Sequence, residues 1–171
     1  MTATHAAAQA VDGFYLGTSV AVNTGNFNVG FGDYSYAGSS LGIFAGYNRV
    51  VGDWVLGAEL AYQSEAISDI PFETYGASDI LDLKARFGKN FGQTYVYGAL
   101  GYSSASATYD NSNWGKMDGV NYGVGFETSI RENVFVGGEI LHRDFSNDNT
   151  ASNYFDDSPL TTASIRLGIR F

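Results

Sequence analysis

Leu160-Thr161-Thr162-Ala163-Ser164-Ile165-Arg166-Leu167-Gly168-Ile169-Arg170-Phe171 is the last segment of the chain, and its pattern decides the fold. Counting back from Phe171, every second residue is apolar or small, while Arg166 and Arg170 fall between them. An extended strand with this alternation has one apolar face and one charged face. A water-soluble protein would have to cover the apolar face with a second layer, whereas a barrel with lipid outside and a polar interior uses both faces. The segment therefore predicts a strand of a membrane-spanning β-barrel.

The same alternation recurs along the chain. It is found in residues 14–22, 41–48, 54–62, 81–87, 95–102, 120–130 and 134–143, which together with 160–171 make eight segments. Glycine alternates with large or charged side chains on the inward positions, as the narrow interior of an eight-stranded barrel requires. The fifth segment is ambiguous, because Tyr95, Tyr97 and Ala99 are as apolar as the residues between them. Both orientations of that segment remain open.

The connections between these segments alternate in length. Short turns are expected at 51–53, 88–93 and 131–133, and long polar segments run over 24–38, 64–78, 103–118 and 144–159. Short turns at one end and long loops at the other are typical of outer-membrane barrels, whose termini lie on the periplasmic side. We therefore predict an all-β fold, an eight-stranded antiparallel up-and-down transmembrane β-barrel with short periplasmic turns and four long extracellular loops. Residues 13–171 form the barrel, and residues 1–12 form a flexible N-terminal segment.

The composition agrees with one β-rich domain. The 171 residues include 22 Gly, 12 Tyr and 12 Phe but only 2 Pro, and no segment has a sustained helical period. A membrane-spanning helix would need roughly 20 apolar residues, and no apolar run approaches that length. Cysteine is absent, which excludes disulfides, thiolate nucleophiles and cysteine metal sites. Ala8-Gln9-Ala10 looks like the small-residue end of a secretory signal, so we expect the chain to begin near a cleavage site.

Aromatic residues gather near the ends of the expected strands. A membrane barrel carries belts of aromatic side chains at its two interfaces. Ordinary core packing is the alternative, but clustering at two depths favours belts. The predicted belt residues are Tyr47, Trp54, Phe87 and Phe135 at the periplasmic boundary and Tyr62, Tyr102 and Tyr122 at the outer boundary.

The net charge of −9 is distributed unevenly along the chain. Eleven acidic residues lie in or beside the four long polar segments, against the single base Lys116. The outer rim is therefore expected to be strongly negative. Clustered carboxylates could bind divalent cations, but EF-hand spacing is absent, and we favour a solvated surface that keeps the loops soluble. We predict no metal site and no cofactor.

Eight charged residues fall on inward positions. They are Glu59, Asp82, Lys84, Arg86, Glu127, Glu139, Arg143 and Arg166, four acids and four bases. Charges in a narrow lumen surrounded by hydrocarbon are costly unless they are paired. We therefore predict one neutral ion-pair cluster that plugs the barrel. Either it fixes the register and fills space, which we favour, or it is a gate whose pairs exchange to let ions pass.

His142 is the one plausible candidate for a catalytic residue, and it should face lipid near the outer end of its strand. Lipid A deacylases of the outer membrane resemble this chain in size and strand number, and they pair such a histidine with a serine two residues later. Asp144 occupies that position here, and the nearest serine is Ser146. Because the base lacks a nucleophile at the expected place, we predict that the protein is not an enzyme. A soluble lipocalin-type barrel is disfavoured, since its interior would be apolar.

Residues 13–171 resemble the small outer-membrane β-barrel family that includes the OmpA transmembrane domain, OmpX and porin-family surface proteins. The resemblance rests on Gly13-Phe14-Tyr15-Leu16-Gly17, on Val96-Tyr97-Gly98-Ala99-Leu100-Gly101-Tyr102 and on the final strand. It implies the outer membrane of a Gram-negative bacterium, with outer-membrane lipid and lipopolysaccharide as partners. It also implies recognition by the outer-membrane assembly machinery, for which Ile165, Leu167, Ile169 and Phe171 are the expected signal.

The resemblance further implies a structural or surface-exposed, adhesion-type role, with a polar, largely plugged lumen and loops available to an extracellular ligand. The alternatives are a small low-conductance pore gated by the interior ion pairs and, as a minor one, a lipid A-modifying enzyme. We expect a monomer. Nucleic acid is excluded as a partner, because an acidic chain repels phosphate.

Overall fold

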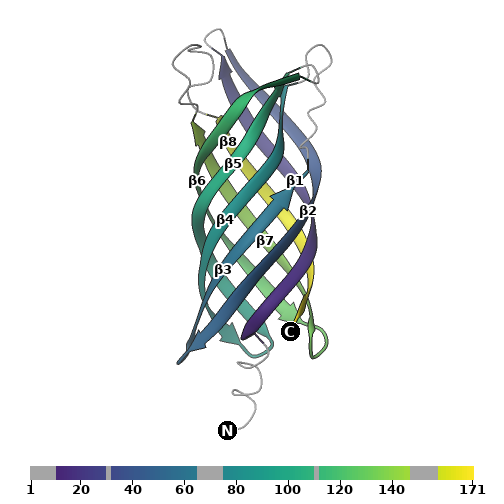
Figure 1. Ribbon diagram of the computed structural model, residues 1–171, viewed down its shortest axis with the longest axis vertical. Coiled ribbons are helices and arrows are strands. Elements are labelled where there is room, and N and C mark those ends of the chain that lie inside the picture. Colours follow the sequence, from purple (N-terminus) through teal and green to yellow (C-terminus); the bar gives the residue numbers. More distant parts are fainter. Residues whose placement is uncertain (1–10, 30–31, 65–74, 110–111, 147–157) are drawn as a thin grey trace.

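The computed structural model describes residues 11–29, 32–64, 75–109, 112–146 and 158–171. The strands are β1 (Gly13–Val29), β2 (Gly32–Val51), β3 (Trp54–Gln63), β4 (Tyr75–Phe91), β5 (Thr94–Tyr109), β6 (Ser112–Ser129), β7 (Val134–Ser146) and β8 (Ser158–Arg170). Each strand pairs antiparallel with the next, and β1 pairs with β8, so that the sheet closes into a barrel (Figure 1). These pairings confirm the eight-stranded antiparallel barrel. In the described part of the chain, no helix is long and apolar enough to cross a membrane.

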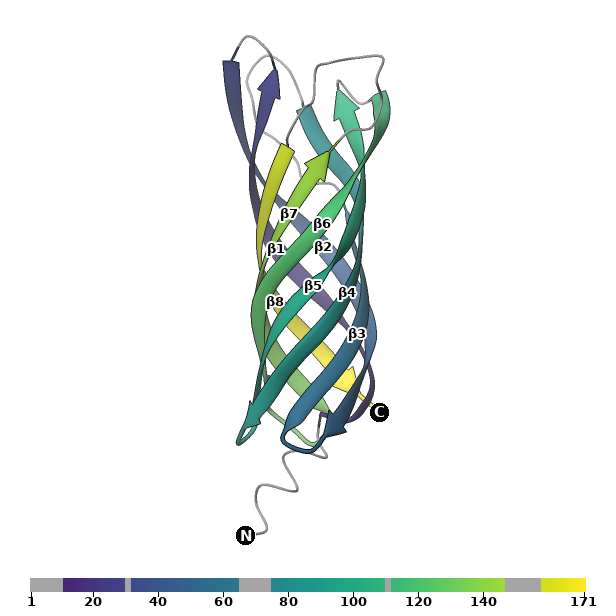
Figure 2. The same cartoon turned by 90° about the vertical axis from the view of Figure 1, so that its left-hand side faces the viewer.

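Tight turns join β2 to β3, β4 to β5 and β6 to β7 at the end of the barrel where β8 finishes (Figures 1 and 2). Gly52 and Gly92 both have a φ of 64°, the left-handed region that glycine enters without steric cost. The backbone N–H of Phe171 donates to the carbonyl of Phe14 at 2.8 Å, which ties the end of the chain to β1. Three short turns are thus present as predicted, although the one expected over 88–93 is shorter, because residues 88–91 belong to β4. This end is the periplasmic one in an outer-membrane barrel.

The strands are longer than predicted at the opposite, outer end. β1 and β2 remain paired as far as Val29 and Gly32, and β5 and β6 as far as Tyr109 and Ser112. The predicted long loops over 24–38 and 103–118 are therefore wrong, since most of each segment is strand. Above the hydrocarbon neither face of a strand needs to be apolar, so the pairing continues where the hydrophobic alternation fades. The connections 65–74 and 147–157 lie outside the described residues.

Where side chains are described, they alternate between the lipid face and the lumen, apart from a register shift in β4 between Ser78 and Leu81. The register settles the ambiguous fifth segment. Leu100 and Tyr102 are exposed on the outer face of β5, while Tyr95 and Tyr97 are buried inside. Tyr97 lies opposite Gly125 of β6. A Cβ atom on Gly125 would be 2.5 Å from the Tyr97 ring, so only glycine leaves room for this ring in the lumen.

Side chains fill the lumen in layers. At the outer end Ile80, Met117, Phe145 and Leu160 form a buried apolar cluster. Charged and polar groups follow toward the periplasmic end, together with an aromatic cluster of Tyr15, Phe44 and Phe135. A second apolar cluster contains Val11, Val55, Tyr95, Tyr97, Ala99 and Leu141. Buried apolar, charged and aromatic side chains thus line the lumen at several depths.

The N-terminal segment contacts the barrel sooner than predicted. Val11 is buried against Val55 and Tyr95, and Asp12 accepts a hydrogen bond from the backbone N–H of Val50 at 3.3 Å. Val11 and Asp12 therefore belong to the folded barrel. The prediction of a flexible segment over residues 1–12 is wrong for these two residues, because the apolar Val11 side chain packs among the inward side chains of the strands. Residues 1–10 lie outside the described residues.

Six of the predicted belt residues, Tyr47, Trp54, Tyr62, Phe87, Tyr102 and Tyr122, have exposed side chains on the outer face. Trp54 stacks on Phe87 with ring centroids 4.4 Å apart, and Phe14 packs against Tyr47 at 4.8 Å. The prediction of Phe135 as a belt residue is wrong. This residue is fully buried in the lumen beside Tyr15, because it shares the inward parity of Glu139 on β7.

Two substitutions test whether the inward glycines are required because larger side chains would not fit in the lumen. One replaces a glycine of the lumen and the other a glycine of the lipid face. Gly125→Leu should destabilise the barrel by about 1 to 3 kcal/mol, the usual range for overpacking, because its side chain would overlap Tyr97. Gly98→Leu should be tolerated, since the nearest heavy atoms to a Cβ there are 3.9 Å away on the lipid face. Urea unfolding of the refolded protein would measure both, and equal losses would contradict the packing argument.

Candidate functional site: the charged interior of the barrel

Arg143 and Asp82 form the outermost ion pair of the lumen. The Arg143 Nε and Nη2 atoms donate to the two carboxylate oxygens of Asp82 at 2.8 and 2.6 Å. Asp82 also accepts a hydrogen bond from the hydroxyl of Ser103 at 2.6 Å, and Arg143 donates to Thr162 at 2.6 Å. The two-point geometry is the strongest form of a carboxylate–guanidinium contact. β7 is thereby joined to β4 across the lumen.

Glu59 of β3 is the centre of a second group of charges. Lys84 Nζ lies 2.8 Å from its Oε1, and Arg166 donates to both of its oxygens at 3.0 and 2.5 Å. Arg86 donates to its Oε2 at 2.8 Å. Three bases from β4 and β8 therefore converge on one buried carboxylate. The free-energy cost of moving the Glu59 carboxylate out of water is offset by the opposite charges of these three bases.

Two further carboxylates complete this group. Glu139 of β7 accepts from Lys84 at 2.6 Å and lies 3.0 Å from Arg166 Nη1. Glu127 of β6 accepts from Arg86 at 2.5 Å and from Arg170 at 2.9 Å. The network links five strands, β3, β4, β6, β7 and β8, at the middle and periplasmic part of the lumen.

The structure places all eight predicted charged residues in the lumen, but in two groups instead of one. No ion pair among the described residues joins the Asp82–Arg143 pair to the Glu59 group. Arg170, which was not among the eight predicted residues, also faces the lumen and pairs with Glu127. The described interior therefore holds five bases against four acids, so the predicted neutrality is wrong. Arg170 has the same period-two parity as Arg166, which was a signal available in the sequence.

Aromatic rings flank the interior arginines and lower the cost of burying them. Arg86 lies over the Tyr97 ring at 3.8 Å, Arg166 over Phe44 at 3.9 Å and Arg170 over Phe135 at 4.2 Å. A guanidinium over a ring face gains about 0.5 to 2 kcal/mol, more when both are desolvated. These contacts explain how the lumen accommodates one base more than its carboxylates balance. Of these rings, the sequence analysis had assigned Phe135 to the lipid-facing belt and had left the orientation of Tyr97 open.

Tyrosine hydroxyls complete the network. Tyr15 donates to Glu59 at 2.8 Å and accepts from Arg86, and Tyr97 donates to Glu139 at 3.0 Å. Each buried carboxylate of the Glu59 group thus has at least two partners. A network in which every carboxylate has several partners favours one arrangement of the strands, because any slip in register would leave charges unpaired.

On the outer face His142 lies between two polar side chains. Its Nδ1 is 2.8 Å from Thr161 Oγ1, and its Nε2 is 3.0 Å from Asp144 Oδ1. The Tyr122 ring packs against the imidazole with centroids 5.3 Å apart. Thr161 comes from the neighbouring strand β8, a hydroxyl that the search for a serine on β7 had missed. Elsewhere at this boundary, Tyr62 donates to Asp79 at 2.6 Å, and Tyr102 donates to Asp118.

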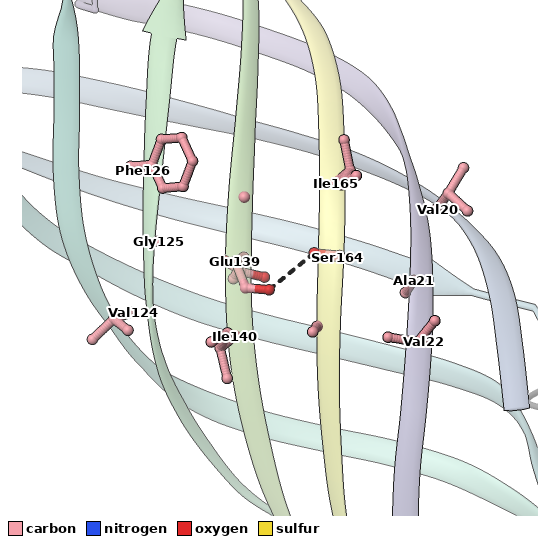
Figure 3. A pocket seen from close by; sticks show the side chains of 12 residues that line it. Val20, Ala21, Val22, Val124, Gly125, Phe126, Glu139, Ile140, Ser164 and Ile165 are labelled. Carbon is pink, nitrogen blue, oxygen red and sulfur yellow. Dashed lines mark hydrogen bonds between the residues drawn. The ribbon is translucent and has the colours of Figure 1, made fainter. Parts of the chain in front are cut away.

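A groove of about 420 Å³ crosses the lipid face of β6, β7, β8 and β1 (Figure 3). Val20, Val22, Ile140 and Ile165 surround it, and the Ser164 hydroxyl beneath donates to the Glu139 carbonyl at 3.4 Å. The groove thus offers apolar contact of the kind that membrane hydrocarbon provides. No group of three or more His, Asp or Glu side chains able to hold a metal ion occurs in the described parts of the chain.

A barrel with an apolar outer face and a charged, paired interior is the architecture of outer-membrane proteins. The family model described as Outer membrane protein beta-barrel domain matches residues 1–171. The chain belongs to this family. It is therefore an outer-membrane protein of a Gram-negative bacterium, as the sequence had indicated.

Known relatives agree with this membership. A 22 kDa outer membrane protein of Rhizobium leguminosarum bv. viciae is 26% identical over 170 residues, which cover 92% of this chain and 76% of the relative. Neisserial surface protein A has a similar structure, with a TM-score of 0.67, 17% identity and coverage of 94% of this chain and 98% of that one. Ail, the attachment invasion locus protein of Yersinia pestis, in its complex with the heparin analogue sucrose octasulfate, is also similar. Its TM-score is 0.60 at 13% identity, and the match covers 93% of this chain and 99% of that one. At these identities the two structures show a shared fold.

Breaking the outermost ion pair should be strongly destabilising. Arg143→Gln leaves Asp82 buried with Ser103 as its remaining hydrogen-bond donor among the described residues, at a cost of about 3 to 5 kcal/mol. Adding Asp82→Asn should recover most of that loss, because the uncompensated charge is gone. Urea unfolding in detergent micelles would measure the free energies.

Arg170→Gln is the matched control. Its partner Glu127 keeps Arg86 at 2.5 Å, so this variant should lose less stability than Arg143→Gln. Equal losses for the two arginines, or a double variant no more stable than Arg143→Gln, would contradict the pairing that we describe.

Proposed function

We propose that this outer-membrane barrel is a non-conducting, non-enzymatic structural protein that presents its outer rim to a partner at the cell surface. The observation that supports the proposal is the set of buried side chains that point into the lumen at several depths. Buried ion pairs occupy the middle of the barrel, the apolar layer around Phe145 and Leu160 lies outside them, and Val11 packs near the periplasmic end. The protein acts as a monomer whose chemistry is concentrated on its extracellular side.

The charge of the rim supports a basic partner. Asp79 and Asp144 have exposed side chains at the outer end of the barrel, and seven more acids lie in the connections 65–74, 110–111 and 147–157. A surface of one sign attracts the opposite sign over about 8 to 10 Å at physiological salt. The Ail structure was solved with an anionic ligand, the heparin analogue sucrose octasulfate. The rim of the present chain favours the opposite charge.

A low-conductance pore is the second candidate, and shared partners support it. Lys84 contacts both Glu59 and Glu139, and Arg166 lies near both of these carboxylates. Bases that have two partners could exchange between them without ever losing a counter-charge. We favour the closed barrel, because exchange in the Glu59 group leaves the apolar layer around Phe145 in place.

The group around His142 resembles a catalytic site in part, but it lacks one element that catalysis requires. Thr161 and Asp144 lie within hydrogen-bonding distance of its two ring nitrogens, an arrangement similar to that of a nucleophile, a base and an orienting acid. Acyl transfer also requires donors aimed at a developing oxyanion. The nearby backbone amides belong to the β7–β8 ladder, which already uses them in pairing. We assign this group to anchoring the barrel at the lipid headgroups.

Single-channel recording in planar bilayers separates the two candidates. The wild-type protein and the Lys84→Ala and Arg166→Ala variants should all show no conductance steps, because the apolar layers remain when the Glu59 group is weakened. Steps that appear in both variants would establish the gated pore. Heat-modifiable migration on gels would verify that each variant has folded.

The surface role has its own measurement. Neutralising Asp148, Asp156 and Asp157 to asparagine should reduce the adhesion of protein-bearing vesicles to a poly-lysine surface, and the loss should shrink as salt increases. Asp53→Asn, in a periplasmic turn, is the control and should leave adhesion unchanged when the protein is inserted with its rim outward. Unchanged adhesion of the triple variant would contradict a rim that binds through its acids.

A further inference from the structure

A hollow of about 310 Å³ lies on the lipid face near the periplasmic end of β3–β6. Its lining combines aromatic rings, small residues and one base: Trp54, Phe87, Gly88, Lys89, Phe91, Val96, Tyr97, Gly98 and Val124. The groove of Figure 3 has no charged side chain on its lipid face, since its one acid, Glu139, points into the lumen. A cation beside an apolar hollow distinguishes this place from the groove of Figure 3.

Gly98 forms the open floor of the hollow. The strand register places Phe87 on one side of Gly98 and Val124 on the other, and both side chains are exposed. A Cβ atom on Gly98 would meet no heavy atom closer than 3.9 Å. The open floor between these two apolar side chains offers dispersion contacts to a hydrocarbon chain lying against the barrel.

Lys89 is held at the edge of the hollow by aromatic contacts. Its ammonium lies 4.1 Å from the centroid of the Trp54 ring, and Trp54 stacks on Phe87 at an interplanar angle of 16°. Lys89 forms no ion pair with any described residue, and Asp53 in the adjacent turn is exposed. The lysine of the lumen, by contrast, contacts two carboxylates. The charge of Lys89 is thus available to a ligand.

We propose that this hollow binds one anionic phospholipid of the periplasmic leaflet. The lipid phosphate contacts the Lys89 ammonium, and one acyl chain lies over Gly98 between Phe87 and Val124. The place suits this ligand because a belt of aromatics and lysine marks the depth of the headgroups, and a lysine stem extends along apolar surface while its ammonium reaches the interface. The aromatic platform under Lys89 reduces the entropy lost when the lysine binds the phosphate.

Native mass spectrometry of the delipidated protein tests the site. With equimolar phosphatidylglycerol and phosphatidylethanolamine of identical acyl chains, the first lipid bound to the wild type should be phosphatidylglycerol. Lys89→Gln should weaken phosphatidylglycerol binding about fivefold, the factor expected for one lysine near an anionic surface. It should weaken phosphatidylethanolamine binding less, because the ammonium of that headgroup offsets the phosphate charge. Gly98→Leu should weaken both lipids, because its side chain fills the floor of the hollow.

Arg131→Gln is the matched control for charge, since it removes an exposed base from a turn at the same end of the barrel. It should retain the wild-type preference, and so should Lys116→Gln at the outer end. A wild type without preference for phosphatidylglycerol would overturn the proposal, as would a loss in Arg131→Gln equal to that in Lys89→Gln. The experiment does not depend on the function proposed for the rim or the lumen.

Discussion

Charge pairing inside a narrow barrel is the constraint on which the rest of this structure depends. The lumen of eight strands is surrounded by hydrocarbon, so an unpaired charge there would face neither water nor counter-ions. Glu59 meets this constraint because it forms ion pairs with Lys84, Arg86 and Arg166. The Arg166 contact joins β3 to β8, strands at opposite ends of the sequence, whereas Lys84 and Arg86 lie on β4, the strand paired with β3. The charges therefore specify which strand lies opposite which, in addition to filling the barrel.

Glycine and aromatic residues make this arrangement possible. Gly125 leaves room for the Tyr97 ring, and that ring in turn lies under the guanidinium of Arg86. Arg170 adds a fifth base near the periplasmic end, where Glu127 and the Phe135 ring receive it. The slight excess of positive charge is thus stabilised by ring faces as well as by carboxylates. A side chain at position 125 would therefore displace the ring on which Arg86 packs.

Much of this interior could be predicted from the period-two alternation, which depends only on the local geometry of a strand. The lumen positions of Glu59, Asp82 and Arg143 followed from it directly. The pairing itself did not follow, because it depends on the stagger between strands, which no local pattern encodes. Arg143 selects Asp82 across the barrel, and this separates the charges into two groups where one had been expected.

The errors at the strand ends have a common physical cause. Hydrophobic alternation marks only the part of a strand that crosses hydrocarbon, so the paired outer ends of β1–β2 and β5–β6 read as loops. Near the periplasmic end, aromatic residues occur both in the interfacial belt and in the lumen. The position of each residue in the period-two alternation of its strand determines its direction. Phe135 and Arg170 point into the lumen, whereas Trp54 and Phe87 face lipid.

Solid-state NMR of the protein in lipid bilayers tests the paired interior most directly. With ¹⁵N-labelled arginine and ¹³C-labelled glutamate, the account predicts strong dipolar contact between the Arg166 guanidinium and the Glu59 carboxylate, whose nitrogen and oxygen lie 2.5 Å apart. The contact should vanish in Arg166→Gln and persist in Arg131→Gln. Arginine signals that exchange rapidly with water and show no contact to glutamate would contradict a closed, charge-paired lumen.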